Sequence, residues 1–187
     1  ILCTCWYVTK DNPQQADEVV HAEQVIKFLN HNYEVDNKLT TPPTYHYILT
    51  SVCYVFGVNS LQGIRFVNMC LLFILFIPII YLLSKSFQKT LQSFFFPIMF
   101  FYFVLIYTDI FSLCLILISF YLVTKRYYIS SACFSTLAIF VRQNNVFWAL
   151  FIMGYDLIVN FEEYNNISEY GKKVWYYIVG VGLFVVY

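Results

Sequence analysis

The sequence predicts an all-α polytopic membrane protein. Hydrophobic residues make up 60% of the 187 residues, charged residues make up only 12%, and the mean hydropathy is +0.64. Soluble globular chains carry about 25% charged residues, so this composition is typical of a chain that lies largely within a bilayer. Aromatic residues reach 21%, and many tyrosines stand near the ends of apolar runs, where an amphipathic ring fits the membrane surface.

A polar segment at residues 10–63 is followed by a series of apolar runs. A straight span takes about 20 apolar residues, and several runs are shorter, so we expect some short, kinked or re-entrant helices. Pro78 and Pro97 are the expected kink sites. The predicted transmembrane runs are 64–83, 93–107, 110–123, 129–141, 146–159 and 174–187.

Both ends of the chain lie in apolar sequence. Residues 1–8 are expected to be the tail of a span, because no basic segment precedes them as in a signal peptide. We therefore expect an N-terminal piece of a longer polytopic protein. It would form a single transmembrane domain over residues 1–187, with a functional polar loop at 10–63 and transmembrane helices and short loops at 64–187.

The basic residues of the short loops predict the orientation. By the positive-inside rule these loops are cytoplasmic, which puts residues 10–63, Asp109 and Arg142 on the opposite side, the lumen of a eukaryotic endomembrane. This orientation requires residues 93–123 to cross the membrane twice. The basic residues of these short loops are Lys85, Lys89, Lys125, Arg126, Lys172 and Lys173.

The eleven basic and eleven acidic residues of the chain balance, which excludes an electrostatic footprint for nucleic acid.

The polar segment itself predicts two helices. The first covers residues 17–30, and the second begins at Pro42-Pro43, with Gly57 as its C-terminal cap. The second helix is amphipathic and is expected to lie in the plane of the membrane surface. Its predicted apolar stripe is Tyr45, Ile48, Leu49, Val52 and Phe56.

The first helix carries the strongest candidate for proton chemistry, formed by Asp17, Glu18 and His21. One interpretation is a general base, since the helix dipole holds a carboxylate at the N-terminus ionised and His21 lies one turn away. The other interpretation is plain helix-terminal charge. A metal site is a weaker alternative, because one histidine falls short of zinc-helix spacing, and the scattered cysteines predict neither metal nor disulfide.

Two further motifs leave alternatives open. Thr40-Thr41-Pro42-Pro43 is either a stiff connector or a rigid wall of a cleft. Arg142, at the start of Arg142-Gln143-Asn144-Asn145, is either a phosphate ligand or an arginine whose head reaches the headgroup layer.

Five motifs follow one another along the chain. They are Asp17-Glu18-x-x-His21-x-x-Gln24, Thr40-Thr41-Pro42-Pro43, Arg65-Phe66-Val67-Asn68, Tyr107-Thr108-Asp109 and Arg142-Gln143-x-Asn145. In this order they resemble the endoplasmic-reticulum α-1,2-glucosyltransferases of N-glycan assembly. The resemblance covers roughly residues 16–153. It implies a GT-C-type, multi-pass protein of the endoplasmic-reticulum membrane whose first lumenal loop carries the catalytic carboxylate.

The resemblance also implies substrates and residue roles. The donor is dolichyl-phosphate glucose, the acceptor is the diglucosylated lipid-linked oligosaccharide, and the product carries a terminal α-1,2-linked glucose formed with inversion. A phosphate leaves without a proton, so one base suffices: Asp17, with Glu18 as the second candidate. No cofactor or metal is implied. The implied substrate-binding residues are His21, Gln24, Thr41, Pro42, Pro43, Asp109, Arg142, Gln143 and Asn145.

Two other function classes stay open. A mannosyltransferase that uses dolichyl-phosphate mannose would share the topology and the loop carboxylate. A transporter or channel would place ionisable residues at mid-bilayer depth on facing helices, whereas here they stand near the ends of the runs.

Overall fold

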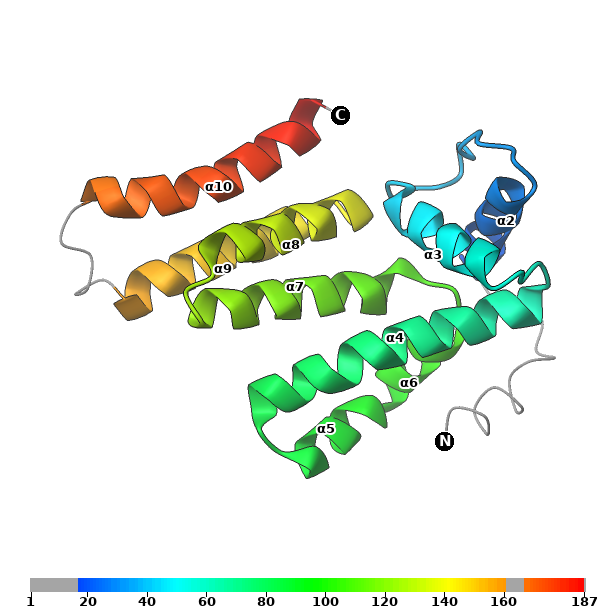
Figure 1. Cartoon of the computed structure of the whole chain (residues 1–187), viewed down its shortest axis with the longest axis horizontal. Coiled ribbons are helices and arrows are strands. Elements are labelled where there is room, and N and C mark those ends of the chain that lie inside the picture. The colour runs from blue at the N-terminus through cyan, green and yellow to red at the C-terminus, as the bar shows by residue number, and fades with distance from the viewer. Residues whose placement is uncertain (1–16, 161–166, 187) are drawn as a thin grey trace. The chain divides into compact units, whose positions relative to one another are not determined.

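The computed structural model describes residues 17–160 and 167–186 (Figure 1). Every regular element within these ranges is a helix, which confirms the all-α prediction. The expected span tail at residues 1–8 lies outside the described residues. The chain divides into two compact units, Ile1–Phe111 and Ser112–Tyr187.

The helix bounds agree with most of the predicted runs. The runs at 64–83, 110–123, 129–141 and 146–159 match α4, α7, α8 and α9 to within three residues at each end. The last helix was predicted too short, because it begins at Ile167 and so includes Lys172 and Lys173, which we had placed in a loop. The helices are α2 (Glu18–Leu29), α3 (Thr44–Val55), α4 (Leu61–Ser84), α5 (Phe87–Phe94), α6 (Pro97–Val104), α7 (Thr108–Thr124), α8 (Tyr128–Val141), α9 (Asn145–Asn160) and α10 (Ile167–Val186).

Helix α2 confirms the helix predicted over residues 17–30. Glu18 lies in its first turn and Lys27 in its last, so each charge interacts favourably with the helix dipole. The helix is buried on more than its apolar face: Glu18 and Gln24 are as fully enclosed as Val25. Buried polar side chains need partners, and their partners build the site described below.

Helix α3 begins after Pro43 and ends before Gly57, as predicted. Gly57 has a φ of +64°, a left-handed conformation that glycine adopts without steric strain. The predicted apolar stripe was partly wrong, since Phe56 is 72% exposed and Ile48 and Val52 are only half-buried. The face that is buried instead includes His46, because this ring packs against α2. The buried residues of α3 are Tyr45, His46, Leu49 and Cys53.

Helices α5 and α6 together return along α4 (Figure 1). The predicted run at 93–107 is therefore two helices, with Pro97 at the first position of α6, where its missing N–H is harmless. Pro78, the other expected kink site, lies inside the continuous helix α4. Aromatic rings join the three helices, with Phe103 edge-on to both Phe76 and Phe94. The chain thus arrives back at the N-terminal end of α4.

The second unit is held by buried hydroxyl groups on otherwise apolar helices. Ser119 of α7 lies 2.7 Å from the hydroxyl of Ser135 and 2.9 Å from that of Ser131, both on α8. Ser131 in turn lies 2.6 Å from the Tyr177 hydroxyl of α10. These hydroxyls satisfy one another in apolar surroundings, so they fix the register of three helices.

Length and hydropathy single out few membrane-crossing helices in the described ranges. Helix α4 passes alone, α6 and α7 pass only when taken together as a sharply bent pair, and α8 and α9 are apolar but shorter. The multi-pass part of the predicted fold class therefore stays a prediction.

A pair of glycines in α10 tests the packing of the second unit. A Cβ atom at Gly180 would lie 1.9 Å from Oγ1 and 3.1 Å from Cβ of Thr136, whereas one at Gly182 would meet nothing within 4 Å. We expect Gly180→Ala to lower the free energy of unfolding by about 1–3 kcal/mol, because α8 and α10 must separate. Gly182→Ala is the matched control and should be neutral or slightly stabilising. Thermal unfolding in detergent measures both, and equal midpoints would contradict the close approach.

Candidate active site

The start of α2 is fixed by a buried ion pair. Arg65 of α4 donates to both carboxylate oxygens of Glu18, at 2.8 Å from Nε to Oε1 and 2.6 Å from Nη2 to Oε2. The side chains of both residues are almost fully buried, at 0% and 2% exposure for Glu18 and Arg65. Oε1 also accepts the backbone N–H of Ile106 at 3.2 Å. The Glu18 carboxylate is thus fully engaged within the protein.

Asp17, the residue before Glu18, lies in the opposite environment. It is exposed, and its side chain makes no capping hydrogen bond to α2. Its backbone carbonyl accepts the first helical hydrogen bond, from His21 at 3.1 Å. Burial and the charge of the nearby Asp17 carboxylate both raise the pKa of the Tyr107 hydroxyl. The side chain is therefore not used as a helix cap, and the two interpretations of Asp17, a general base and plain helix-terminal charge, both stay predictions.

The segment between α6 and α7 is tied to the same place. Asn68 of α4 donates from Nδ2 to the Leu105 carbonyl at 2.9 Å, and its Oδ1 accepts the Tyr45 hydroxyl of α3. The phenol oxygen of Tyr107 lies against the backbone N–H groups of Asp17 and Glu18. Three segments distant in sequence therefore converge on the first turn of α2.

Two histidines complete the cluster. Nδ1 of His21 lies 2.9 Å from Nε2 of His46, and the rings stack with centroids 5.1 Å apart. The Tyr107 ring meets His21 edge-on at 5.8 Å. Burial, together with the neighbouring His21, lowers the pKa of His46 to about 3. His46 is therefore neutral at physiological pH.

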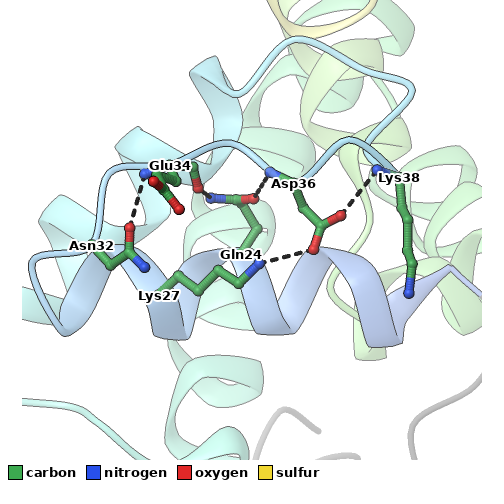
Figure 2. A network of polar contacts seen from close by, with 6 residues as sticks. All are labelled: Gln24, Lys27, Asn32, Glu34, Asp36 and Lys38. Carbon is green, nitrogen blue, oxygen red and sulfur yellow. Dashed lines mark hydrogen bonds and ion pairs between the residues drawn. The ribbon is translucent and has the colours of Figure 1, made fainter.

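Gln24, a predicted sugar ligand, holds the loop that follows α2 (Figure 2). Its Nε2 donates to the Glu34 carbonyl at 3.0 Å and its Oε1 accepts the Asp36 N–H at 2.8 Å. Asp36 also pairs with Lys27 at 2.8 Å and accepts from the Lys38 N–H. The hydrogen bond from the side chain of Lys27 lowers the pKa of Asp36. The amide of Gln24 is thus used at both ends by the protein.

The remaining predicted ligands divide between the two units. Pro43 is buried at the start of α3 and Thr41 and Pro42 are half-buried before it. Asp109 is half-buried in the first turn of α7, where the helix dipole favours its charge.

The second unit holds the others. Arg142 and Gln143 form the turn after α8, half-buried and exposed respectively. Asn145 is buried, and its Nδ2 donates to the Ser112 hydroxyl at 2.6 Å and to the Ala138 carbonyl at 2.7 Å. Asn145 thus anchors the turn that carries Arg142. No three metal-ligating side chains converge within the described ranges.

Sequence reasoning missed the partners that assemble the cluster. Arg65 and Asn68 appeared only as a motif, and His46 was not singled out at all. An arginine at the start of an apolar run is a usable signal, because it needs a buried acceptor or a route to water. No sequence signal pairs His46 with His21, which is 25 residues away.

Comparisons with known proteins identify the family of the chain. A curated relative from Arabidopsis thaliana, named Dol-P-Glc:Glc(2)Man(9)GlcNAc(2)-PP-Dol alpha-1,2-glucosyltransferase, is 30% identical over 161 residues, covering 73% of this chain and 32% of the relative. The chain thus spans about a third of that relative's length. No solved structure was found to match.

The matched relative is, by its name, a glucosyltransferase. A family model described as the DIE2/ALG10 family matches residues 12–187, and the chain belongs to that family. The resemblance predicted from the five motifs is confirmed.

Breaking the buried ion pair should destabilise the first unit severely. Arg65→Met leaves a buried carboxylate without its cation, for which we expect a loss of about 3–5 kcal/mol in the free energy of unfolding. Adding Glu18→Gln should recover part of it. Lys27→Met, which breaks the exposed pair with Asp36, is the matched control and should have a far smaller effect. Comparable losses for Arg65→Met and Lys27→Met in detergent unfolding would refute the anchoring role.

Proposed function

We propose that the protein containing this chain transfers glucose from dolichyl-phosphate glucose to the diglucosylated lipid-linked oligosaccharide. The reaction forms the terminal α-1,2-linked glucose with inversion, in the endoplasmic-reticulum membrane. Family membership and the relative's name support this activity. The structural observation that carries it is the exposed Asp17 carboxylate, placed next to a rigidly anchored helix start.

Asp17 is the proposed general base. The attacking 2-hydroxyl of the acceptor sugar must lose a proton as it bonds to the donor carbon, and the phosphate leaves without taking one. Asp17 is exposed to a substrate, whereas Glu18 is enclosed with both oxygens on Arg65. We therefore assign Glu18 a positioning role, and we assign Asp17 the role of accepting the proton. His21 lies one turn from Asp17 and is proposed to orient a sugar hydroxyl.

The proposed topology has residues 17–63 on the lumenal side of a multi-pass domain. The return of α5 and α6 along α4 supports it, because Leu105 and Ile106 bond to residues at the α2 end of α4. Tyr107 and Asp109 then fall on the same side as Asp17. Lys85 and Lys89 stand at the other end of α4, where the positive-inside rule places the cytoplasm.

Arg142 is proposed to hold the departing phosphate, and Asn145 to fix the turn that carries it. A planar guanidinium binds phosphate oxygens in pairs. Thr41, Pro42, Pro43, Asp109 and Gln143 remain proposed substrate contacts. The family match favours glucose transfer over mannose transfer and over a transporter.

The central test is Asp17→Asn in the full-length enzyme. The substitution removes the base with almost no change in volume, so we expect transfer to fall about 10²–10⁴-fold. The assay uses dolichyl-phosphate glucose and the diglucosylated acceptor, with dolichyl-phosphate mannose as the competing donor. Glu23→Gln, on the exposed face of α2, is the matched control and should keep normal rates. A rate above about a tenth of wild type for Asp17→Asn would remove Asp17 as the base.

A second test separates the two interpretations of Arg142. If Arg142 binds phosphate in a forked geometry, Arg142→Lys should weaken donor affinity nearly as much as Arg142→Ala. If it only reaches the headgroup layer, lysine should be almost silent. Arg126→Ala, in the turn between α7 and α8, serves as the control. Unchanged affinity for dolichyl-phosphate glucose in both Arg142 variants would exclude the phosphate role.

A further inference from the structure

Exposed rings gather where α2 ends and along α3. Tyr33, Tyr47 and Tyr54 are 60%, 40% and 67% exposed. Nδ1 of the exposed His31 lies 3.5 Å from the Tyr33 hydroxyl, and the His31 ring meets Tyr54 edge-on at 6.3 Å. The buried ring of Phe28 contacts both Tyr33, at 6.1 Å, and Tyr47, at 4.4 Å. The four exposed rings are therefore joined by ring contacts, and we call them the aromatic strip.

Tyr47 is a flat and well-supported member of the aromatic strip. Its ring lies almost parallel to that of Phe28, with an angle of 4° between the two planes. Phe28 is buried at 2% exposure, so it holds the inner face of Tyr47 and leaves the outer face accessible. Tyr54 follows two helical turns later on α3 and so lies on the same side of that helix. Because these rings are already held in place, a flat ligand that stacks on them orders little further.

The turn after α2 holds His31 in a conformation that glycine usually supplies. The His31 N–H donates to the Phe28 carbonyl at 3.0 Å. The Asn32 N–H donates to the Lys27 carbonyl, also at 3.0 Å, and the two bonds together make a Schellman motif. His31 has a φ of +59°, which is sterically unfavourable for a residue with a Cβ atom. Since glycine would avoid this strain, the imidazole at this position points to a use of the side chain in the aromatic strip.

The chemistry of the aromatic strip favours a sugar as its ligand. The face of an aromatic ring carries partial negative charge, so it attracts the slightly positive C–H groups on the flat side of a sugar ring. Phenol and imidazole groups can also bond to sugar hydroxyls. Exposed polar residues stand beside these rings in the sequence, namely Asn32, Glu34 and Ser51. A charged Glu34 is costly to place in hydrocarbon, which favours a hydrated ligand over lipid.

The aromatic strip begins at the end of α2 opposite to Asp17. Helix α2 has 12 residues, so about 18 Å along its axis separates the two. A single sugar is too short for that distance, whereas an oligosaccharide can reach from one to the other. The glycan in the name of the Arabidopsis relative, Glc(2)Man(9)GlcNAc(2), contains many sugars beyond the one that reacts.

We propose that the aromatic strip binds sugars of the acceptor oligosaccharide that lie away from the reacting hydroxyl, by stacking them on Tyr47 and Tyr54 beside Tyr33. This inference rests on the proposed function and extends its acceptor site by four residues. The strip makes no contact with the reacting atoms, so it contributes to acceptor affinity and not to the chemical step.

The first test varies Tyr47 in the full-length enzyme. Tyr47→Trp keeps a flat ring on Phe28, whereas Tyr47→Leu keeps an apolar side chain and removes the ring. We expect Tyr47→Leu to raise KM for the lipid-linked oligosaccharide about fivefold with kcat nearly unchanged, and Tyr47→Trp to stay within about twofold of wild type. Tyr81→Leu, near the C-terminal end of α4 and 50% exposed, is the matched control for loss of an exposed tyrosine. If the strip contacts lipid instead, leucine should be tolerated, and an unchanged KM would overturn the proposal.

His31→Gly separates binding from folding. Glycine adopts a left-handed φ without strain, so the unfolding midpoint in detergent should not fall. The ring contacts of His31 with Tyr33 and Tyr54 are lost, so KM for the acceptor should rise about threefold. A lower midpoint with a normal KM would mean that the ring serves stability alone, and it would remove His31 from the strip.

Glycan binding can also be measured without the reaction. The probe is the free glycan Glc(2)Man(9)GlcNAc(2), and saturation-transfer NMR detects its mannose protons that lie against the protein. We expect this signal in the wild-type enzyme and in Asp17→Asn, and we expect its loss in Tyr47→Leu. An equal signal in Tyr47→Leu would overturn the proposal even if Asp17→Asn abolishes transfer. Binding that depends on Tyr47 in an enzyme that transfers no glucose would instead reject only the proposed function.

Discussion

The buried ion pair between Glu18 and Arg65 is the constraint on which the first unit depends. Burying either charge without the other would be strongly destabilising, because transfer out of water costs several kcal/mol per ion. Glu18 also accepts from Ile106, so one carboxylate joins the start of α2, the start of α4 and the segment after α6. These contacts lie 47 and 88 residues apart along the chain. A local geometry at Asp17 is thus maintained by long-range contacts.

The adjacent carboxylates Asp17 and Glu18 show how one helix start serves two purposes. Successive residues on a helix point about 100° apart, so one side chain enters the protein while the other faces outward. The helix dipole favours the charge of both. Burial and a bidentate partner make Glu18 a good anchor, and exposure makes Asp17 the one that a substrate can reach. The chemistry assigned to each follows from accessibility and not from residue type.

The second unit achieves rigidity by other means. Its apolar helices carry serine, tyrosine and asparagine side chains that bond to one another or to backbone carbonyls. Such groups are costly to leave unsatisfied in apolar surroundings, so their pairing fixes helix register. Asn145 extends this network to the turn after α8. Arg142 is therefore presented from a fixed turn, although its own side chain is long and adaptable.

The sequence by itself determined the helical class, most helix bounds, the caps at Pro43 and Gly57, and the family. These depend on composition, apolar periodicity and local turn chemistry, which act over a few residues. It also placed Asp17, Glu18 and His21 on one helix. Only the tertiary structure decided which carboxylate is buried, that Gln24 holds a loop, and that His46 meets His21. Those outcomes depend on partners 10 to 47 residues away. No local pattern encodes them, because burial and desolvation arise only when α2, α3 and α4 pack together.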